Sequence, residues 1–146
     1  MPNRIHVAFV AGLLATAAFG IAQTTPQIKE VPVKRTSPAS GKQMYANYCA
    51  ACHGVDGRGN GPAAVALKDH PTDLTQLAKE NGGKFPDLHV SAVLQFGSEH
   101  PAHGSKDMPV WGPTLRSLSQ GGPVSDMEVH QRIANLTDYL REIQQK

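Results

Sequence analysis

The sequence predicts a small, single-domain, all-α protein. Its 146 residues are 40% hydrophobic and 18% charged, which suits one globular core rather than two. Helix starts and stops recur along the chain, and no segment shows sustained two-residue alternation with β-branched residues, so a sheet-based fold is disfavoured. Only 5% of the residues are aromatic, while Gly (14) and Pro (11) are plentiful. The protein core should therefore be thin, and a bound group could complete it.

The first residues have the pattern of an export signal. A short basic start at Arg4 precedes an apolar run over residues 7–19, and small residues stand at positions 20 and 22, where a signal peptidase would inspect them. We therefore expect residues 1–22 to be a signal peptide that is cleaved after Ala22. A retained membrane anchor is the alternative, although the apolar run is shorter than the ~20 residues that span a bilayer comfortably.

Residues 23–39 are predicted to be a flexible lead-in, and residues 40–146 are predicted to form the folded domain. The lead-in has mixed charges, three prolines and no periodic apolar pattern. Across the whole chain, 14 Lys and Arg residues against 12 Asp and Glu residues give a formal net charge of +2. A field this weak argues against a nucleic-acid partner and against binding to an acidic membrane surface.

Three helices are predicted in the first part of the domain. The first covers residues 38–51 and begins at a capping box formed by Ser40 and Gln43. Its apolar face comprises Met44, Tyr45 and Tyr48. A short helix follows near residues 72–79, and another begins at Pro86 and stops at Gly97. The apolar positions of this third helix are Leu88, Val93, Leu94 and Phe96.

The C-terminal part of the domain is predicted to be one loop and one long helix. Residues 98–123 are expected to form the loop, since turn-forming Gly and Pro recur in this stretch. A capping box at Ser125 and Glu128 then opens the helix. The apolar residues of that helix repeat every three to four positions: Val129, Ile133, Leu136, Leu140 and Ile143.

The residues that carry chemistry form the string Cys49-Ala50-Ala51-Cys52-His53. Two thiols at this spacing can each add across one vinyl group of a haem, and the adjacent histidine can then reach the iron from one face. A thioredoxin-like dithiol, a zinc site and a lone disulfide are the alternatives. The dithiol expects a βαβ context, zinc expects a second ligand pair, and a disulfide leaves the histidine without a role. The sequence therefore favours one haem c, bound covalently through Cys49 and Cys52.

On these residues the chain resembles a class I (monohaem) cytochrome c over about residues 40–146. The motif from Cys49 to Gly54 matches the haem motif of that family. Further matches are the glycine-rich loop Gly57-x-Gly59-x-Gly61-Pro62, the methionine loop Met108-Pro109-Val110-Trp111-Gly112, and Tyr139, which the family packs against the first helix near Gly41 and Tyr45. The resemblance implies a small all-α fold with about four to five helices wrapped around one covalently attached haem.

The resemblance also implies roles around the haem. The carbonyl of Pro62 would accept a hydrogen bond from the second ring nitrogen of His53 and so fix the ring. Arg58 and Trp111 are candidates to contact the haem propionates, because each supplies a donor. Apolar residues are expected to line the haem crevice or the helix contacts around it: Tyr45, Tyr48, Leu94, Phe96 and Leu115.

Met108 is the predicted sixth ligand of the iron. It lies far enough beyond His53 for the chain to wrap the macrocycle, in a loop with Gly and Pro that can approach the ring closely. A thioether is a soft, neutral ligand that favours ferrous iron and raises the reduction potential. The competing ligands are the histidines between the motif and Met108: His89, His100 and His103, with His103 favoured among them. His70 and His130 are expected on the surface without a role, and Met127 is expected to pack in the last helix.

Three function classes remain open. The favoured one is not an enzyme: it is a soluble, monomeric electron carrier of the periplasm that exchanges single electrons with redox proteins such as a respiratory dehydrogenase or oxidase. It would use no small-molecule substrate. A haem enzyme or gas sensor would need a displaceable distal ligand, and Met108 argues against that class. A haem subunit of a dehydrogenase or oxidase complex would have the same chemistry but would stay docked.

Overall fold

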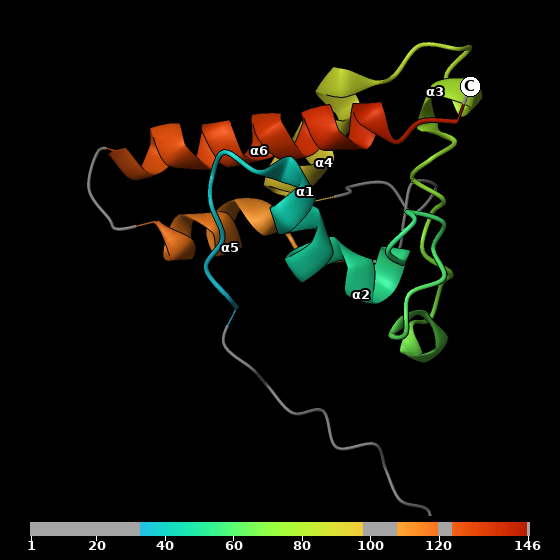
Figure 1. Cartoon of the computed structure of the whole chain (residues 1–146), viewed down its shortest axis with the longest axis horizontal. Helices are drawn as coiled ribbons and strands as arrows, with labels where there is room; N and C mark the ends of the chain where they lie inside the picture. The colour runs from blue at the N-terminus through green and yellow to red at the C-terminus, as the bar shows by residue number, and fades with distance from the viewer. Residues whose placement is uncertain (1–32, 98–107, 120–123, 146) are drawn as a thin grey trace, which may run out of the picture. The chain divides into compact units, whose positions relative to one another are not determined.

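The computed structural model describes residues 33–97, 108–119 and 124–145 (Figure 1). All of them belong to one compact unit, Pro32–Lys146. This described part of the chain contains helices, turns and bends and no strand, which confirms the all-α prediction. The predicted signal peptide lies outside it. Among the helices of the described ranges, none is both long enough and apolar enough to cross a membrane.

The cysteines lie on a helical stretch near the start of the domain. It runs continuously through α1 (Gly41–Met44), a π-helical turn η1 (Tyr45–Cys49) and α2 (Ala50–His53). Half of the predicted capping box is confirmed, because the hydroxyl of Ser40 accepts a hydrogen bond from Gln43 N at 3.2 Å. The side chain of Gln43 accepts from Ser37 N, at 2.9 Å, and not from Ser40 N. The predicted apolar face is also buried: Met44, Tyr45 and Tyr48. Gly54 ends the stretch with a φ of 79°, which favours glycine.

Shorter elements connect this stretch to the next long helix. They are the 3₁₀ turn η2 (Ala64–Ala66) and α3 (Leu77–Glu80), and the helix that follows is α4 (Asp87–Phe96). Val90 and Leu94 form the buried face of α4. The prediction was wrong for Leu88 and Phe96, which are 89% and 67% exposed. Each lies two residues, or about 200° around the helix, from a buried residue, and so faces away from the core.

A helix replaces part of the predicted C-terminal loop. This helix, α5 (Trp111–Leu118), was missed, although Trp111, Leu115 and Leu118 recur at helical spacing. Leu115 and Leu118 are buried. Pro113 does not break the helix, because the amide groups of a first turn have no partner within a helix. The loop prediction gave Gly and Pro more weight than this apolar repeat.

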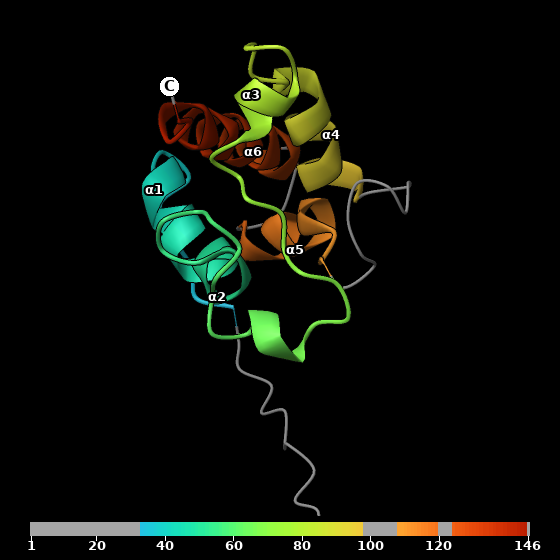
Figure 2. The same ribbon diagram turned by 90° about the vertical axis from the view of Figure 1, so that its right-hand side faces the viewer.

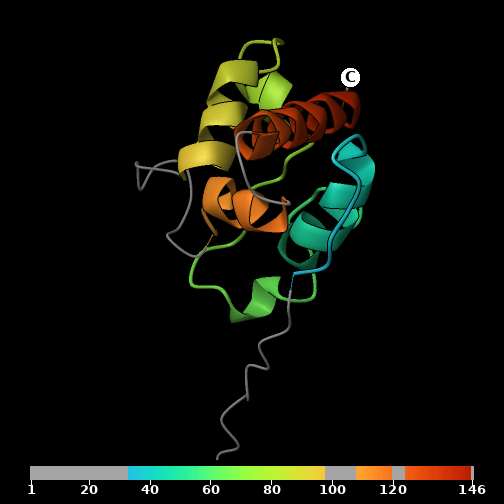
Figure 3. The same cartoon turned by 90° about the vertical axis from the view of Figure 1, so that its left-hand side faces the viewer.

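The long helix α6 (Val124–Glu142) packs against α1, α4 and α5. Figures 2 and 3 show α1 on one flank of α6 and α4 on the other. Four of the five predicted apolar residues of α6 are buried: Val129, Ile133, Leu136 and Leu140. The fifth, Ile143, lies just after the end of the helix and is only partly buried. Gly41 allows the close approach of α1, because a Cβ there would overlap the carbonyl oxygen of Asn135. The rings of Tyr45 and Tyr139 also meet, with centroids 5.3 Å apart.

The end of the predicted lead-in is packed against the domain. Thr36 is 8% exposed, and its carbonyl oxygen accepts a hydrogen bond from Arg132 Nη1 at 3.0 Å. Asn135 Nδ2 donates to the carbonyl oxygen of Pro38 at 2.8 Å. Thr36 and Pro38 are therefore bonded to α6, while most of residues 33–39 are exposed. Such isolated hydrogen bonds leave no periodic pattern in a sequence.

Candidate haem-binding site

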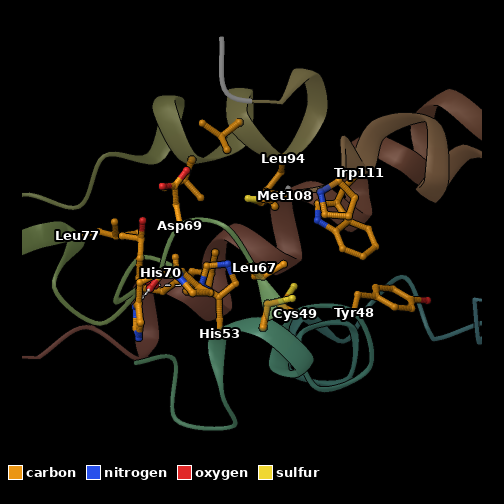
Figure 4. Close-up of a pocket in the computed structure, with 18 of the residues that line it drawn as sticks. Tyr48, Cys49, His53, Leu67, Asp69, His70, Leu77, Leu94, Met108 and Trp111 are labelled. Atoms are coloured by element: carbon orange, nitrogen blue, oxygen red, sulfur yellow. Dashed lines mark hydrogen bonds between the residues drawn. The ribbon is translucent and has the colours of Figure 1, made fainter. Parts of the chain in front are cut away.

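A cavity lies between the cysteine-bearing stretch, α4 and the start of α5 (Figure 4). It brings together five residues that the sequence singles out: Cys49, Cys52, His53, Met108 and Trp111. Much of its wall is aliphatic, from residues that include Leu67, Leu74, Leu77, Val90, Val93 and Leu94. The cavity therefore presents a largely apolar wall next to two thiols and an imidazole.

Cys49 and Cys52 reach the cavity from one face of the helical stretch, because residues three apart are neighbours on a helix. Both are free thiols. Cys49 is 8% exposed, and burial, with a smaller contribution from Cys52, raises the pKa of the Cys49 thiol to about 12. Cys49 is therefore a neutral thiol at neutral pH. The π-helical turn ends at this residue, and π-helical turns are frequent at functional sites.

His53 is held by a loop that returns past it. Its Nδ1 lies 3.0 Å from the carbonyl oxygen of Thr72. Because a carbonyl oxygen only accepts, this contact requires a proton on Nδ1, and in the neutral ring the lone pair of Nε2 is then free. Burial lowers the pKa of His53, and the Thr72 carbonyl opposes this only in part. The imidazole is therefore neutral at neutral pH, which is the form that binds a metal ion.

Thr72, and not Pro62, supplies the carbonyl that faces His53. Pro62 is exposed and is not among the residues that line the cavity. Its neighbours are bonded to the helix instead: Gly61 N donates to the carbonyl oxygen of Cys52 at 3.0 Å. The glycine-rich loop thus packs on the end of α2. The hydrogen bond to His53 that the resemblance assigns to the Pro62 carbonyl is made instead by the carbonyl of Thr72.

Met108 lines the cavity across from His53 (Figure 4). It is half-buried and lies just before α5. Of the competing histidines, His89 also lines the cavity, from α4. His100 and His103 lie outside the described residues. The structure therefore brings one thioether and one further imidazole to the side of the cavity away from the cysteines.

The two candidate donors for propionates are in different places. Trp111 lines the cavity and stacks on Tyr48, with ring centroids 5.6 Å apart and an angle of 24° between the rings. Arg58 does not line the cavity; its side chain is 59% exposed and lies 3.8 Å from Asp56. The glycine-rich loop turns Arg58 toward solvent, so the structure does not support its expected role.

The structure adds two polar residues that sequence reasoning missed. Asp69 and His70 both line the cavity. His70 was expected on the surface, and it is exposed while still lying at the cavity. No local pattern marks these positions. Only the return of the loop past His53, which also places Thr72 there, could have identified them.

The expected crevice residues divide into three groups. Tyr48 and Leu94 line the cavity. Tyr45 and Leu115 are core residues, 2% and 0% exposed, that do not reach it. Phe96 lies outside both the cavity and the core. The cavity wall is made chiefly by the cysteine-bearing stretch, the loop before α3, α4 and residues 108–111.

A comparison with family models agrees with this fold and this cavity. The model of the family Cytochrome c matches residues 38–144, and the chain belongs to that family as a class I cytochrome c. A comparison with curated proteins finds no match. The family suggests a haem c electron carrier, and the spacing of Cys49 and Cys52 fits the covalently bound haem that the family implies.

The residues of the cavity fit a haem c. Two free thiols lie one helical turn apart, the Nε2 atom of His53 is available as a ligand, and the surrounding wall is largely apolar. Among the residues that the structure describes, no group of three or more His, Cys, Asp or Glu side chains converges as a separate metal site.

Proposed function

We propose that this protein carries single electrons through one haem c, which is attached to Cys49 and Cys52 and held axially by His53 and Met108. When bound, haem c supplies an iron centre that cycles between the ferric and ferrous states. The observation that carries the proposal is the convergence of two thiols, an imidazole and a thioether on one largely apolar cavity.

The residues around the cavity have distinct tasks in this proposal. The Thr72 carbonyl orients the ring of His53 and increases its basicity as a ligand. Met108 favours ferrous iron because a thioether is soft and neutral. The apolar wall disfavours the extra positive charge of the ferric state. Both effects raise the reduction potential, which suits a protein that accepts and passes on electrons.

A carrier explains these residues better than a catalyst does. With both axial positions filled by side chains, no position is open for a substrate, so we propose neither an enzymatic activity nor a small-molecule substrate. His89 is a second candidate for the sixth ligand, since it also lines the cavity. A second imidazole would give a lower potential than Met108, so the potential and the spectrum distinguish the two ligands.

We further propose that the protein works in the periplasm, as a monomer, between redox proteins such as a respiratory dehydrogenase and an oxidase. The predicted signal over residues 1–22 supports export. The formal charge of +2 is too small for strong long-range steering, which favours a small, transient contact with each partner.

Production of the full chain in a host that attaches haem c tests the haem and its ligands. Intact mass should show cleavage after Ala22 and one added haem. The oxidised protein should show the weak far-red absorption band of iron–sulfur ligation, and cyanide at modest concentration should leave that band unchanged. A colourless product would contradict the haem. A coloured product without the band would point to one of the competing histidines, His89, His100 or His103, and rapid, complete cyanide binding would favour an enzyme or sensor.

Size-exclusion chromatography of native extracts tests the free carrier. A free carrier should elute as a small monomer. Persistent co-migration with a larger complex would show instead that the protein is a haem subunit of a dehydrogenase or oxidase.

A further inference from the structure

We propose that the N-terminal segment Lys34–Thr36, which precedes the first helix, positions the Met108 side of the haem site through Tyr48. The inference rests on the proposed ligation by His53 and Met108, and it gives a role to residues outside the haem motif. Tyr48 is the link, because its ring lines the cavity while its hydroxyl is bonded to the N-terminal segment.

The hydroxyl groups form a directional chain of hydrogen bonds that begins at a cation. Tyr48 Oη donates to the carbonyl oxygen of Lys34 at 2.8 Å. Its single proton is then used, so Thr36 Oγ1 donates to Tyr48 Oη, at 2.7 Å. Arg132 Nη1 in turn donates to Thr36 Oγ1 at 3.2 Å. Successive hydrogen bonds polarise one another, so each member strengthens the next.

Burial makes this chain sensitive to the loss of one member. Arg132 is 3% exposed, and Thr36 and Tyr48 are each 8% exposed. Glu128 balances the charge of Arg132 at 2.7 Å, which leaves Nη1 for the N-terminal segment. Without the Thr36 hydroxyl, Tyr48 Oη would lose its donor and Arg132 would lose an acceptor, in a place where water is largely excluded.

Trp111 connects Tyr48 to the Met108 side of the cavity, so a restraint on the Tyr48 ring also restrains this side. The two rings stack with centroids 5.6 Å apart. Trp111 is the first residue of α5, three positions after Met108, and both line the cavity. Figure 4 shows Met108 beside Trp111, with Tyr48 next to them. A fixed Tyr48 ring therefore holds the chain around Met108 in a set position relative to the adjacent Cys49.

Competition with an external ligand can measure this positioning. In the proposed ligation, cyanide would compete with Met108 for the iron. Contacts that fix Trp111 also restrain the backbone three residues away at Met108, so they would favour the state with Met108 bound. Contacts that hold Trp111 therefore lower the apparent affinity for cyanide. If the chain of hydrogen bonds had only a structural role, its loss would lower the stability of the whole domain without a specific effect on the affinity for cyanide.

The test uses holoprotein of the full chain and measures the far-red band, the reduction potential and cyanide affinity. Thr36→Val removes the hydroxyl with little change of shape, Thr36→Ser keeps a hydroxyl, and Tyr48→Phe removes the phenol oxygen but keeps the ring. Thr137→Val is the matched control. Thr137 is a threonine of α6 that is 3% exposed, and its hydroxyl lies 3.2 Å from Ser91 Oγ, outside the chain of hydrogen bonds.

We expect Thr36→Val and Tyr48→Phe to bind cyanide about fivefold to tenfold more tightly, as the loss of about one net hydrogen bond implies. Their reduction potentials should fall, whereas Thr36→Ser and Thr137→Val should behave as wild type.

Unchanged cyanide affinity in Thr36→Val, or an equal rise of the affinity in Thr137→Val, would overturn the inference but would not contradict the proposed ligation by His53 and Met108. Absence of the far-red band from wild type would overturn the proposed ligation and this inference together. If Tyr48→Phe fails to mature, the two Thr36 variants still decide.

Discussion

Two sides of the cavity are held by different kinds of interaction. The His53 side, residues 49–72, is closed by the backbone: Gly59 N donates to the carbonyl oxygen of His53 at 2.8 Å, and Ala63 N donates to that of Ala51, also at 2.8 Å. Three glycines on this side lie where a Cβ would overlap a neighbouring atom: Gly54, Gly59 and Gly61. Main-chain geometry therefore sets the position of His53.

The Met108 side, residues 108–118, is held chiefly by side chains, with one close backbone approach at Gly112, where a Cβ would overlap the carbonyl oxygen of Gln95. Trp111 stacks on Tyr48, and Leu115 is fully buried in the core. A single side-chain substitution can weaken packing of this kind. A network of backbone hydrogen bonds is disturbed chiefly by substitutions at positions where a larger side chain would overlap the main chain. The comparison indicates that side-chain substitutions should change the position of Met108 more readily than the position of His53.

The largest expected effect comes from removing an attachment point on the His53 side. Cys52→Ala should impair stable haem attachment and leave a poorly folded chain, because the cofactor fills much of a thin core. Intact mass would report the missing haem, and circular dichroism would report the loss of helix. A compact, heat-stable form without haem would contradict the prediction and would show that the backbone of this side holds the fold unaided.

Removal of the ligand on the other side should have a more local effect. Met108→Ala should keep the covalent haem but lose the far-red band, bind cyanide readily and show a lower reduction potential. Met127→Ala is the control. The prediction that Met127 packs in the last helix was wrong, because this residue of α6 is 72% exposed, and its substitution should leave all these properties unchanged. An unchanged spectrum and potential in Met108→Ala would point to another sixth ligand.

A glycine substitution tests whether the main chain holds the His53 side. At Gly61 a Cβ would overlap the carbonyl oxygen of Ala51, so Gly61→Ala should lower the free energy of unfolding by about 2 kcal/mol or more. Gly82→Asn is the control. Nothing lies within 4 Å of a Cβ there, and asparagine tolerates the φ of 65°, so we expect a loss below about 1 kcal/mol. Denaturant unfolding of the holoproteins measures both, and equal losses would argue against the tight backbone packing.

Sequence reasoning found what is local in the chain. The string Cys49–His53 places both thiols and one ligand within five residues, and its positions on one helical stretch follow from helix geometry. The apolar repeat of α6 likewise predicts its own buried face. The apolar repeat of α5 was equally clear in the sequence, but Gly112 and Pro113 in its first turn led to the prediction of a loop.

The rest of the site depends on contacts between distant segments. Thr72 meets His53 from 19 residues away, and a contact to a backbone carbonyl has no residue-type signature. The expected place of Arg58 depended on the direction of the loop, which Gly57 and Gly59 set with φ values of 82° and 79°. The hydroxyl chain from Arg132 to Tyr48 joins three segments through single polar atoms, which periodicity does not detect.

The smallest effect that we predict concerns a hydrogen bond between the interior of the cysteine-bearing stretch and Gly54, the residue at which the stretch ends. Tyr45 Oη donates to the carbonyl oxygen of Gly54 at 2.6 Å, and the residue is 2% exposed. Tyr45→Phe removes this donor and leaves a buried carbonyl without it, so the free energy of unfolding at neutral pH should fall by about 1–2 kcal/mol.

The pH dependence of this loss is a sharper test, because burial, with smaller contributions from Cys49 and Tyr139, raises the pKa of Tyr45. An unfolded tyrosine ionises at about pH 10, whereas the folded one keeps its proton to higher pH. Above about pH 10 the unfolded state therefore binds fewer protons than the folded state, and the wild type loses stability as the pH rises. Phenylalanine has no such proton, so the stability difference between wild type and Tyr45→Phe should shrink between about pH 10 and pH 11. A difference that stays constant or widens over that range would show that the Tyr45 hydroxyl ionises as freely in the folded protein as in the unfolded chain.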